Sequence, residues 1–304
     1  GVDTFYTDNN GVLMTPDSLA YGSYSLVEVQ APNGYVLDST PLPFKVDSSN
    51  AEEENAVNII RLTKSDTAQK GRISVQKTGK AFVTVNGTGY ASENENEQIS
   101  RVFYTPVFQE KGLENAVFQV IAGEDIITAD GTVRAQAGEV VAELTTNADG
   151  YAETDLLYLG KYEIREISAP YGYVRNDEIH SVELTYAGQE IAVRDTVQDN
   201  FQNDYQNVKI RLSKAMEHDE KYGIGDNKEY LSVRFGLFAA ENITAADGSV
   251  IPENGLIAEI SLDEDMTATI APQLPFAKYY VQEIATDEHY VLNGEKYLVT
   301  FQYQ

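Results

Sequence analysis

Three copies of one stretch organise this chain, and the clearest copy reads Gly160-Lys161-Tyr162-Glu163-Ile164-Arg165-Glu166-Ile167-Ser168-Ala169-Pro170-Tyr171-Gly172-Tyr173. The other two copies run over residues 22–35 and, more loosely, over residues 277–290. In every copy a glutamate follows a tyrosine by four residues, and a second tyrosine follows the glutamate by seven: Tyr24, Glu28 and Tyr35; Tyr162, Glu166 and Tyr173; Tyr279, Glu283 and Tyr290. A spacing that recurs in this way predicts three domains of one kind in tandem.

The alternation inside the repeat places each glutamate on the apolar face of a strand. Tyr162, Ile164 and Glu166 share one face of a period-two pattern, and the corresponding residues of the other copies do the same. A buried carboxylate is costly unless it is paired or protonated, so its recurrence at one position indicates a specific role. The alternative is a glutamate at the end of a strand, capped by the Pro-Gly turn that follows it.

Composition sets outer limits on the function. The chain has 304 residues, 42% of them hydrophobic, with a formal net charge of −26 and no cysteine. The length allows two or three domains with real cores, and the scarcity of helix-length amphipathic runs favours β-structure. The negative charge argues against nucleic acid and anionic membranes as partners, because phosphate binding needs clustered Lys and Arg. Disulfides, thiolate metal sites and a cysteine nucleophile are excluded.

Turn residues divide the remaining sequence into strands and three units. We expect strands at 12–14, 24–29, 42–46, 56–62, 102–108, 116–121 and 140–144. Residues 124–133 return as residues 241–250, an offset of 117 that also relates Glu166 to Glu283, so the second and third units are homologous. The polar stretch 86–98 predicts a mobile loop or hairpin tip. The expected units are residues 1–68, 69–206 with this insertion, and 207–304.

Lysine and asparagine also fall on inward-facing positions. Lys77 shares a strand face with Ile73 and Val75, Lys214 holds the matching position in the third unit, and Asn203 faces inward on the closing strand of the second unit. Burial favours a neutral, nucleophilic amine and a protonated carboxyl group that polarises an amide carbonyl. The pattern predicts a Lys-to-Asn isopeptide bond formed with loss of ammonia. The alternative is a Lys-Glu pair hydrogen-bonded to asparagine without reaction.

Three motifs in register resemble those of one known family. Gly-x-Tyr-x-x-x-Glu-x-x-Ala-Pro-x-Gly-Tyr, the opening Gly-x-Ile-x-Val-x-Lys-Thr-Gly and the closing Asn-Asp-Tyr-Gln are similar to motifs of the collagen-adhesin B-type (CnaB, or SpaA-type prealbumin-like) domains of Gram-positive surface proteins and pilins. The resemblance covers nearly the whole chain. It implies an all-β fold of tandem reversed immunoglobulin-like (prealbumin-like) Greek-key sandwiches, an extracellular, cell-wall-anchored setting and no cofactor. The implied partners are the cell wall or other pilin and adhesin subunits.

The resemblance also implies roles for individual residues. In the second unit Lys77 is the nucleophile, Asn203 the acceptor and Glu166 the catalytic acid. In the first unit Glu28 matches the acid and Asp66 the acceptor, with water as the leaving group. In the third unit Lys214 and Glu283 match the lysine and the acid.

The first and third units each lack one partner of this set. The first unit's lysine is expected before residue 1 and the third unit's acceptor beyond Gln304, so we expect neither unit to carry a full cross-link. The first unit is also expected to depend on upstream sequence or a neighbour for its order. Lys64 shares a strand face with Asp66. An ordinary ion pair between these two residues is an equal alternative to the role of Asp66 as an acceptor.

Other candidate sites carry weaker signals. His180, His218 and His289 lack metal-ligand spacing, and Asp8-Asn9-Asn10-Gly11 predicts a plain turn rather than a calcium loop. No phosphate loop or Ser/His/Asp arrangement is present, so we predict no enzyme that acts on a separate substrate. No signal peptide, transmembrane span or sorting tail is recognisable; because residue 1 falls inside a repeat, we expect a segment of a longer protein.

Two function classes remain open at this stage. One is a structural stalk, pilin backbone or spacer of a wall-anchored protein. The other is a ligand-binding adhesin module that holds a host protein or glycan through residues 86–98 or an exposed strand edge. The family resemblance favours the stalk, although a fold is a poor guide to function. We expect an elongated head-to-tail array, since each unit closes its own core.

Overall fold

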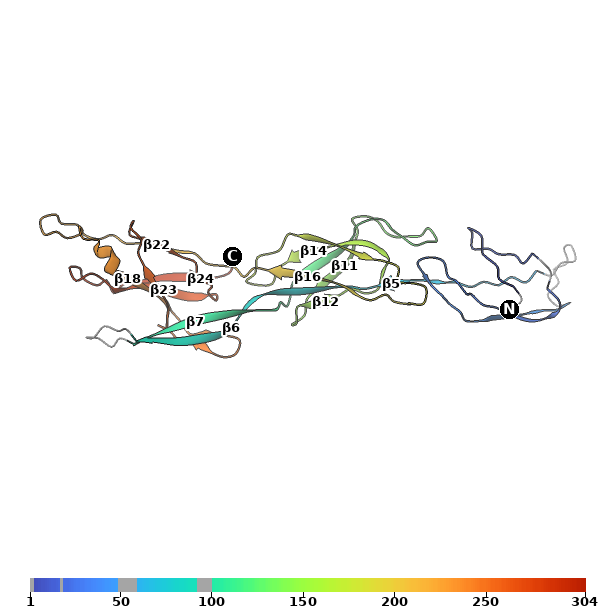
Figure 1. Cartoon of the computed structure of the whole chain (residues 1–304), viewed down its shortest axis with the longest axis horizontal. Coiled ribbons are helices and arrows are strands. Elements are labelled where there is room, and N and C mark those ends of the chain that lie inside the picture. Colours follow the sequence, from blue (N-terminus) through green and yellow to red (C-terminus); the bar gives the residue numbers. More distant parts are fainter. Residues whose placement is uncertain (1–2, 17–18, 49–58, 92–99) are drawn as a thin grey trace.

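The chain forms a long row of three β-sheet units, with the first unit at one end (Figure 1). The computed structural model describes residues 3–16, 19–48, 59–91 and 100–304. Helical structure in these ranges is limited to 3-10 turns, at η2 (Glu229–Ser232) and at Ser48. The predicted all-β class and elongated arrangement are therefore confirmed. Within the described residues no helix has the length and apolar character needed to cross a lipid bilayer.

The second unit is a sandwich of two sheets. Its strands are β5 (Lys70–Gly71), β6 (Ile73–Ala91), β7 (Ser100–Gly112), β8 (Val117–Ala122), β9 (Ile126–Ile127), β10 (Val133–Ala135), β11 (Val140–Thr145), β12 (Tyr151–Glu153), β13 (Leu157–Tyr158), β14 (Gly160–Ser168), β15 (Ile179–Leu184) and β16 (Val197–Asn203). One sheet has the order β11-β8-β14-β15, and the other contains β12 and β16 on either side of β6. The closing strand β16 runs parallel to the opening strand β6.

The apolar alternation of these strands builds the core between the two sheets. Along β14 the side chains of Tyr162, Ile164 and Glu166 are buried while Arg165 is exposed, as a period-two strand requires. They meet the inward-facing side chains of β6 and β16, including Ile73, Val75 and Phe201. The predicted inward phase of the repeat is thus what places a carboxyl group inside the sandwich.

The third unit repeats this plan. Its strands are β17 (Ile210–Ser213), β18 (Arg234–Ala239), β19 (Ile243–Thr244), β20 (Val250–Ile251), β21 (Leu256–Ser261), β22 (Thr267–Ile270), β23 (Ala277–Ala285) and β24 (Lys296–Phe301). The order β21-β18-β23-β24 matches β11-β8-β14-β15, and the β17-β22 pair matches the β6-β12 pair. Within residues 207–304 the structure contains no strand in the place that β16 holds in the second unit.

The first unit is the smallest and departs most from expectation. It contains β1 (Gly22–Leu26), β2 (Tyr35–Val36), β3 (Leu42–Val46) and β4 (Thr67–Ala68). β1 pairs with β3, and β2 pairs with β4. The strand predicted at 12–14 is wrong: Val12 and Met14 are 59% and 80% exposed and no described strand pairs with them. Of the strand predicted at 56–62, residues 59–62 are not in a strand either, and residues 56–58 lie outside the described residues.

A long hairpin joins the second unit to the third. β6 and β7 stay paired from Thr78 and Gly112 to Ala91 and Ser100, and they extend along the third unit (Figure 1). Phe103 of β7 pairs with Leu256 of β21, so one sheet continues across both units. The stretch 86–98, predicted as a mobile loop or hairpin tip, is therefore strand as far as residue 91, because the backbone of β7 pairs with it. Residues 92–98 lie outside the described residues.

Candidate functional site

Lys77, Glu166 and Asn203 meet inside the second unit. Lys77 lies on β6, Glu166 on β14 and Asn203 at the end of β16, and their exposed fractions are 0%, 4% and 3%. In the parallel pairing of β6 with β16, Phe201 lies opposite Lys77 and Asn203 lies opposite Gly79. A Cβ on Gly79 would lie 2.8 Å from the Asn203 carbonyl oxygen, so glycine permits this close approach of the strands.

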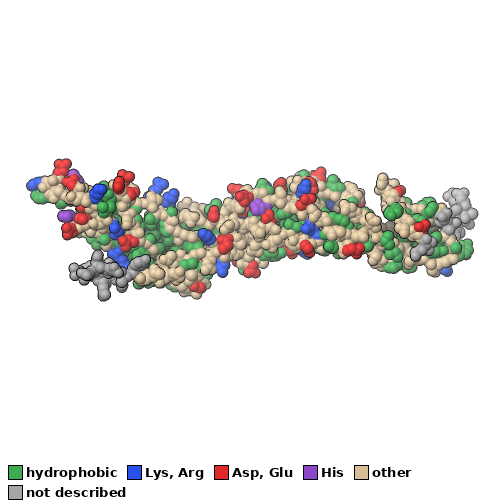
Figure 2. Space-filling model, in the orientation of Figure 1, with side chains coloured by type: hydrophobic (Ala, Val, Ile, Leu, Met, Phe, Trp, Pro, Cys, Tyr) green, Lys and Arg blue, Asp and Glu red, His purple; other side chains and the backbone are tan. Residues whose placement is uncertain are grey.

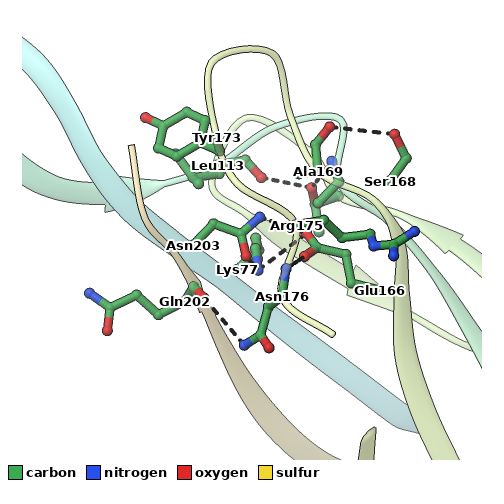
Figure 3. A network of polar contacts seen from close by, with 12 residues as sticks. Lys77, Leu113, Glu166, Ser168, Ala169, Tyr173, Arg175, Asn176, Gln202 and Asn203 are labelled. Atoms are coloured by element: carbon green, nitrogen blue, oxygen red, sulfur yellow. Dashed lines mark hydrogen bonds and ion pairs between the residues drawn. The ribbon is translucent and has the colours of Figure 1, made fainter. Parts of the chain in front are cut away.

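The three side chains form a closed triangle of polar contacts (Figure 3). Lys77 Nζ lies 2.5 Å from Asn203 Oδ1 and 3.2 Å from Glu166 Oε1. Asn203 Nδ2 donates to the same Glu166 oxygen at 2.8 Å. One carboxyl oxygen therefore lies within reach of both nitrogen atoms that the predicted reaction exchanges.

Aromatic rings surround the amine. The Lys77 Nζ atom lies 5.6 Å from the ring centroid of Phe118 and 5.8 Å from that of Phe201. Burial among these rings lowers the pKa of Lys77, and the charge of Glu166 opposes this effect only in part. A neutral amine is the nucleophilic form of lysine, so the surroundings favour attack on the neighbouring amide.

A backbone amide holds the second oxygen of each repeated glutamate. The N–H of Asn176 donates to Glu166 Oε2 at 2.7 Å. The same bond forms ten residues after each of the other glutamates, from Asp38 to Glu28 at 3.1 Å and from Asn293 to Glu283 at 2.8 Å. This contact was not predicted, although an Asp or Asn ten residues after each glutamate is a signal visible in the sequence.

The third unit brings together two members of the set. Lys214 Nζ lies 2.9 Å from Glu283 Oε1, where Glu283 is buried and the Lys214 side chain is 19% exposed. Within the described part of this unit, Glu283 is the side chain that pairs with Lys214. An acceptor amide corresponding to Asn203 is absent from residues 207–304 as described.

The first unit pairs two acids. The side chains of Glu28 and Asp66 are hydrogen-bonded. Burial raises the pKa of Glu28 most, and the neighbouring Asp66 raises it further, whereas the hydrogen bond from the Asp38 amide lowers it. Lys64 Nζ lies 3.4 Å from Asp38 Oδ2 and donates to the Thr40 carbonyl oxygen at 2.8 Å. The alternative ion pair of Lys64 with Asp66 is thus replaced by one with Asp38.

The remaining candidate residues form ordinary local contacts. Each histidine has an aspartate neighbour: His180 with Asp199 at 2.8 Å, His218 with Asp226 at 2.9 Å and His289 with Asp287 at 2.6 Å. Asp8 accepts hydrogen bonds from the backbone N–H groups of Asn10 and Val12, which is turn geometry. Across the described residues no group of three or more His, Cys, Asp or Glu side chains could hold a metal ion.

The fold resembles that of a solved structure. The Bacillus anthracis TIE protein is 21% identical with a TM-score of 0.56; the match covers 94% of this chain and 40% of the TIE chain. This chain thus spans less than half of the length of that protein. The shaft pilin SpaA of Lactobacillus rhamnosus GG is 12% identical (77% and 95% covered, TM-score 0.28), and the major pilin subunit BcpA of Bacillus cereus is 13% identical (76% and 68% covered, TM-score 0.28).

Sequence comparison agrees with the fold. No curated protein sequence matches the chain significantly. The SpaA family, described as a prealbumin-like fold domain, matches residues 1–60 and 107–198, which is half of the chain. The matched ranges contain the repeat stretches of the first two units, with Glu28 and Glu166. This chain belongs to the SpaA family of prealbumin-like fold domains.

Proposed function

We propose that this chain is a shaft segment of a Gram-positive cell-surface protein, a stalk or pilin-like spacer whose second unit is closed by a self-formed isopeptide bond between Lys77 and Asn203. The observation that carries the proposal is the buried contact of Lys77, Glu166 and Asn203 across the opening and closing strands. The elongated row of units supports it (Figure 1). The partners in this proposal are the cell wall and other pilin or adhesin subunits.

The reaction needs no second substrate. Nζ of Lys77 attacks Cγ of Asn203, the Cγ–Nδ2 bond breaks, and the amide nitrogen leaves as ammonia. Glu166 Oε1 contacts both nitrogen atoms, so it is placed to take a proton from Nζ and deliver one to Nδ2. The reaction occurs once in the second unit, and Glu28 and Glu283 hold the corresponding acid positions in units for which the described residues contain no full set of partners. Within these three units the chain acts as a cross-linked structure and not as a turnover enzyme.

The bond would stabilise the second unit and carry load. It closes a loop of 126 residues, which by the chain-entropy relation for cross-links contributes about 5 kcal/mol. It would also tie β6 directly to β16, the strands through which tension enters and leaves this unit. Force applied to the two ends of the row would then pass through the covalent link.

Stretching single molecules tests this role. In the wild-type chain, the residues between Lys77 and Asn203 should contribute no length when the molecule is pulled from its ends. In Glu166→Ala they should add roughly 400 Å, since an extended chain spans about 3.3–3.6 Å per residue. Lys214→Ala is the matched control, because it removes an equivalent lysine from a unit without an acceptor and should leave the second unit inextensible. A wild-type chain that releases this length would contradict the proposed function.

The adhesin alternative finds less support in the structure. The described part of the insertion, residues 86–91, pairs with β7, and Phe82, Val85 and Tyr104 of the hairpin pack against the core of the third unit. These contacts support a bracing role for the hairpin. A binding screen against host proteins and glycans should therefore give the same result with and without residues 86–98; a ligand lost on deletion would favour the adhesin function.

A further inference from the structure

The two joints between units are built from the same contacts, and we propose that they are copies of one clamp that fixes the angle between successive units. The clamp consists of a linker glutamine and a tyrosine of the next unit. The tyrosine lies two residues after the second strand of the hairpin that begins with the repeated stretch, β14–β15 or β23–β24. The clamp surface of each unit therefore binds the preceding unit, which is of the same kind. The inference concerns the joints and does not depend on the isopeptide bond.

The first joint shows the full set of contacts. The backbone N–H of Gln69 donates to the Gly34 carbonyl oxygen at 2.8 Å, and Gln69 Oε1 accepts the N–H of Ala187 at 2.8 Å. The hydroxyl group of Tyr186 donates back to the carbonyl oxygen of Tyr35 at 3.1 Å. Gln69 and Tyr186 therefore both donate to the turn of the first unit, at the carbonyl oxygens of Gly34 and Tyr35.

The second joint repeats these bonds at matching positions. The N–H of Gln206 donates to Gly172 at 2.9 Å, and Gln206 Oε1 accepts the N–H of Gln304 at 3.1 Å. The hydroxyl of Tyr303 donates to the carbonyl oxygen of Tyr173 at 3.2 Å. Tyr303 and Gln304 follow Tyr186 and Ala187 by 117 residues, the offset of the repeat itself. Repetition of three bonds across two separate joints indicates a built interface.

Burial strengthens the first copy of the clamp, whereas Gln206 of the second copy is half-buried. Gln69 is 1% exposed, and its Nε2 atom also donates to the carbonyl oxygens of Gly188 at 2.9 Å and Ile191 at 2.6 Å. These side-chain bonds fix Gln69 to the second unit, so bending the joint would break the bonds from Gln69 to Gly34 and from Tyr186 to Tyr35 and leave these groups unsatisfied. The loop after β15 also returns two contacts, since Gln189 accepts the N–H groups of Ala31 and Leu37. A linker held in this way does not behave as a flexible tether.

The clamp uses the same turn that follows the repeated glutamate. Gly34 and Gly172 lie at positive φ in that turn, and their carbonyl groups receive the linker glutamine. The position of the clamp tyrosine, two residues after the end of β15 or β24, is Ser48 in the first unit. One recurring stretch thus serves both the interior of a unit and its joint with the next.

Spin-label distance measurements test the clamp directly. The chain has no cysteine, so Ser25→Cys in the first unit and Ser181→Cys in the second introduce the only two labelling sites, both exposed. The otherwise wild-type chain should give one narrow distance distribution. Adding Gln69→Ala and Tyr186→Phe together should broaden it at least twofold. The matched control is Gln198→Ala with Tyr151→Phe, whose polar contacts are to Asn200 and Glu153 inside the second unit, and it should leave the distribution narrow.

A second label pair separates loss of the clamp from loss of the fold. Labels at Ala148 and Ser181, both within the second unit, should keep their distance in the clamp variant. If that distance changes, the single variant Tyr186→Phe is the test of the clamp, because it removes one hydroxyl group and keeps the aromatic ring. Broadening between the units in Tyr186→Phe supports the clamp, whereas an unchanged distribution overturns it. A broad distribution before any clamp residue is changed also overturns it.

Discussion

Three glutamates occupy equivalent positions and meet three different partners. Glu166 contacts Lys77 and Asn203, Glu283 contacts Lys214, and Glu28 is hydrogen-bonded to Asp66. Each accepts the same kind of backbone N–H bond from ten residues downstream. The chemistry of each unit is therefore set by which side chains from the opening and closing strands reach the acid.

The acid pair of the first unit predicts an unusual pH dependence. Burial raises the pKa of Glu28 above 4.5, so the unfolded chain ionises first as the pH rises. The stabilising contribution is fully present below pH 4.5 and is lost as the pH rises through the raised value. Asp66→Asn removes the neighbouring carboxyl group and should reduce this loss. Hydrogen exchange of the β1 and β3 amides between pH 4 and 7, corrected for intrinsic rates, measures it; increasing protection of the wild type with pH would contradict the prediction.

Local alternation was sufficient to predict the inward positions of Lys77, Glu166 and Asn203, because a strand with one buried face fixes the direction of every second side chain. The same reasoning could not find Gln69. Its partners lie about 120 residues further along the chain, and no local periodicity in the sequence indicates a hydrogen bond between such distant residues. Asn176 was missed for a different reason, since its backbone and not its side chain contacts the acid.

At the scale of single elements, the turn after β14 presents the amide that holds Glu166. Oδ1 of Asn176 accepts the N–H of Glu178 at 2.9 Å, and the same bond forms from Thr40 to Asp38 and from Glu295 to Asn293. Asn176→Ala should cost about 1 kcal/mol of stability through loss of this bond. Asn176→Asp, the residue type of the first unit, should recover most of it. Thermal unfolding checks both variants, and equal losses in both would reject the role of the turn.

Strand β6 has two roles along its length. Residues 73–79 pair with β16 and carry Lys77, whereas residues 80–91 pair with β7 alone and reach the third unit. Sequence reasoning identified the first part from its apolar alternation. It took the polar stretch from residue 86 for a loop or hairpin tip, because the hydrogen bonds that hold this part as a strand come from the backbone of β7 and leave no compositional signal.

At the scale of the whole molecule, the hairpin braces the second joint. Ser249 Oγ accepts the N–H of Val85 at 2.8 Å, the N–H of Asp247 donates to the Val83 carbonyl oxygen at 3.1 Å, and Arg101 lies 3.1 Å from Glu259. Aromatic rings fill the space beside the clamp, where Phe276 contacts Tyr205 and Phe301 at centroid distances of 4.9 and 4.6 Å. The second joint thus has a brace that the first joint lacks in the described residues.

Removing part of the brace should uncouple the second and third units. Ser249→Ala leaves the half-buried N–H of Val85 without its partner, which costs about 1 kcal/mol. The second and third units should then unfold in two calorimetric transitions, each closer to the temperature at which that unit unfolds by itself. Thr269→Ala, on β22 away from the hairpin, is the control. A single unchanged transition in Ser249→Ala would show that the brace contributes nothing to coupling.

The surface agrees with a stiff rod. On the face shown in Figure 2, acidic side chains are spread over the length of the molecule and do not gather at one end. With a formal net charge of −26, an extended row keeps these charges further apart than a compact globule would. Repulsion between units therefore acts in the same direction as the clamp and the brace.

The central claim is the covalent bond between Lys77 and Asn203, and intact-mass measurement tests it most directly. The wild-type chain should be lighter than its calculated mass by one ammonia. Lys77→Ala, Glu166→Ala and Asn203→Ala should each have the full mass calculated for their sequence, because each removes one of the three groups that meet inside the second unit. Lys214→Ala should still lack one ammonia. A wild-type chain at its full calculated mass, or a Lys77→Ala chain that remains one ammonia short, would contradict the account.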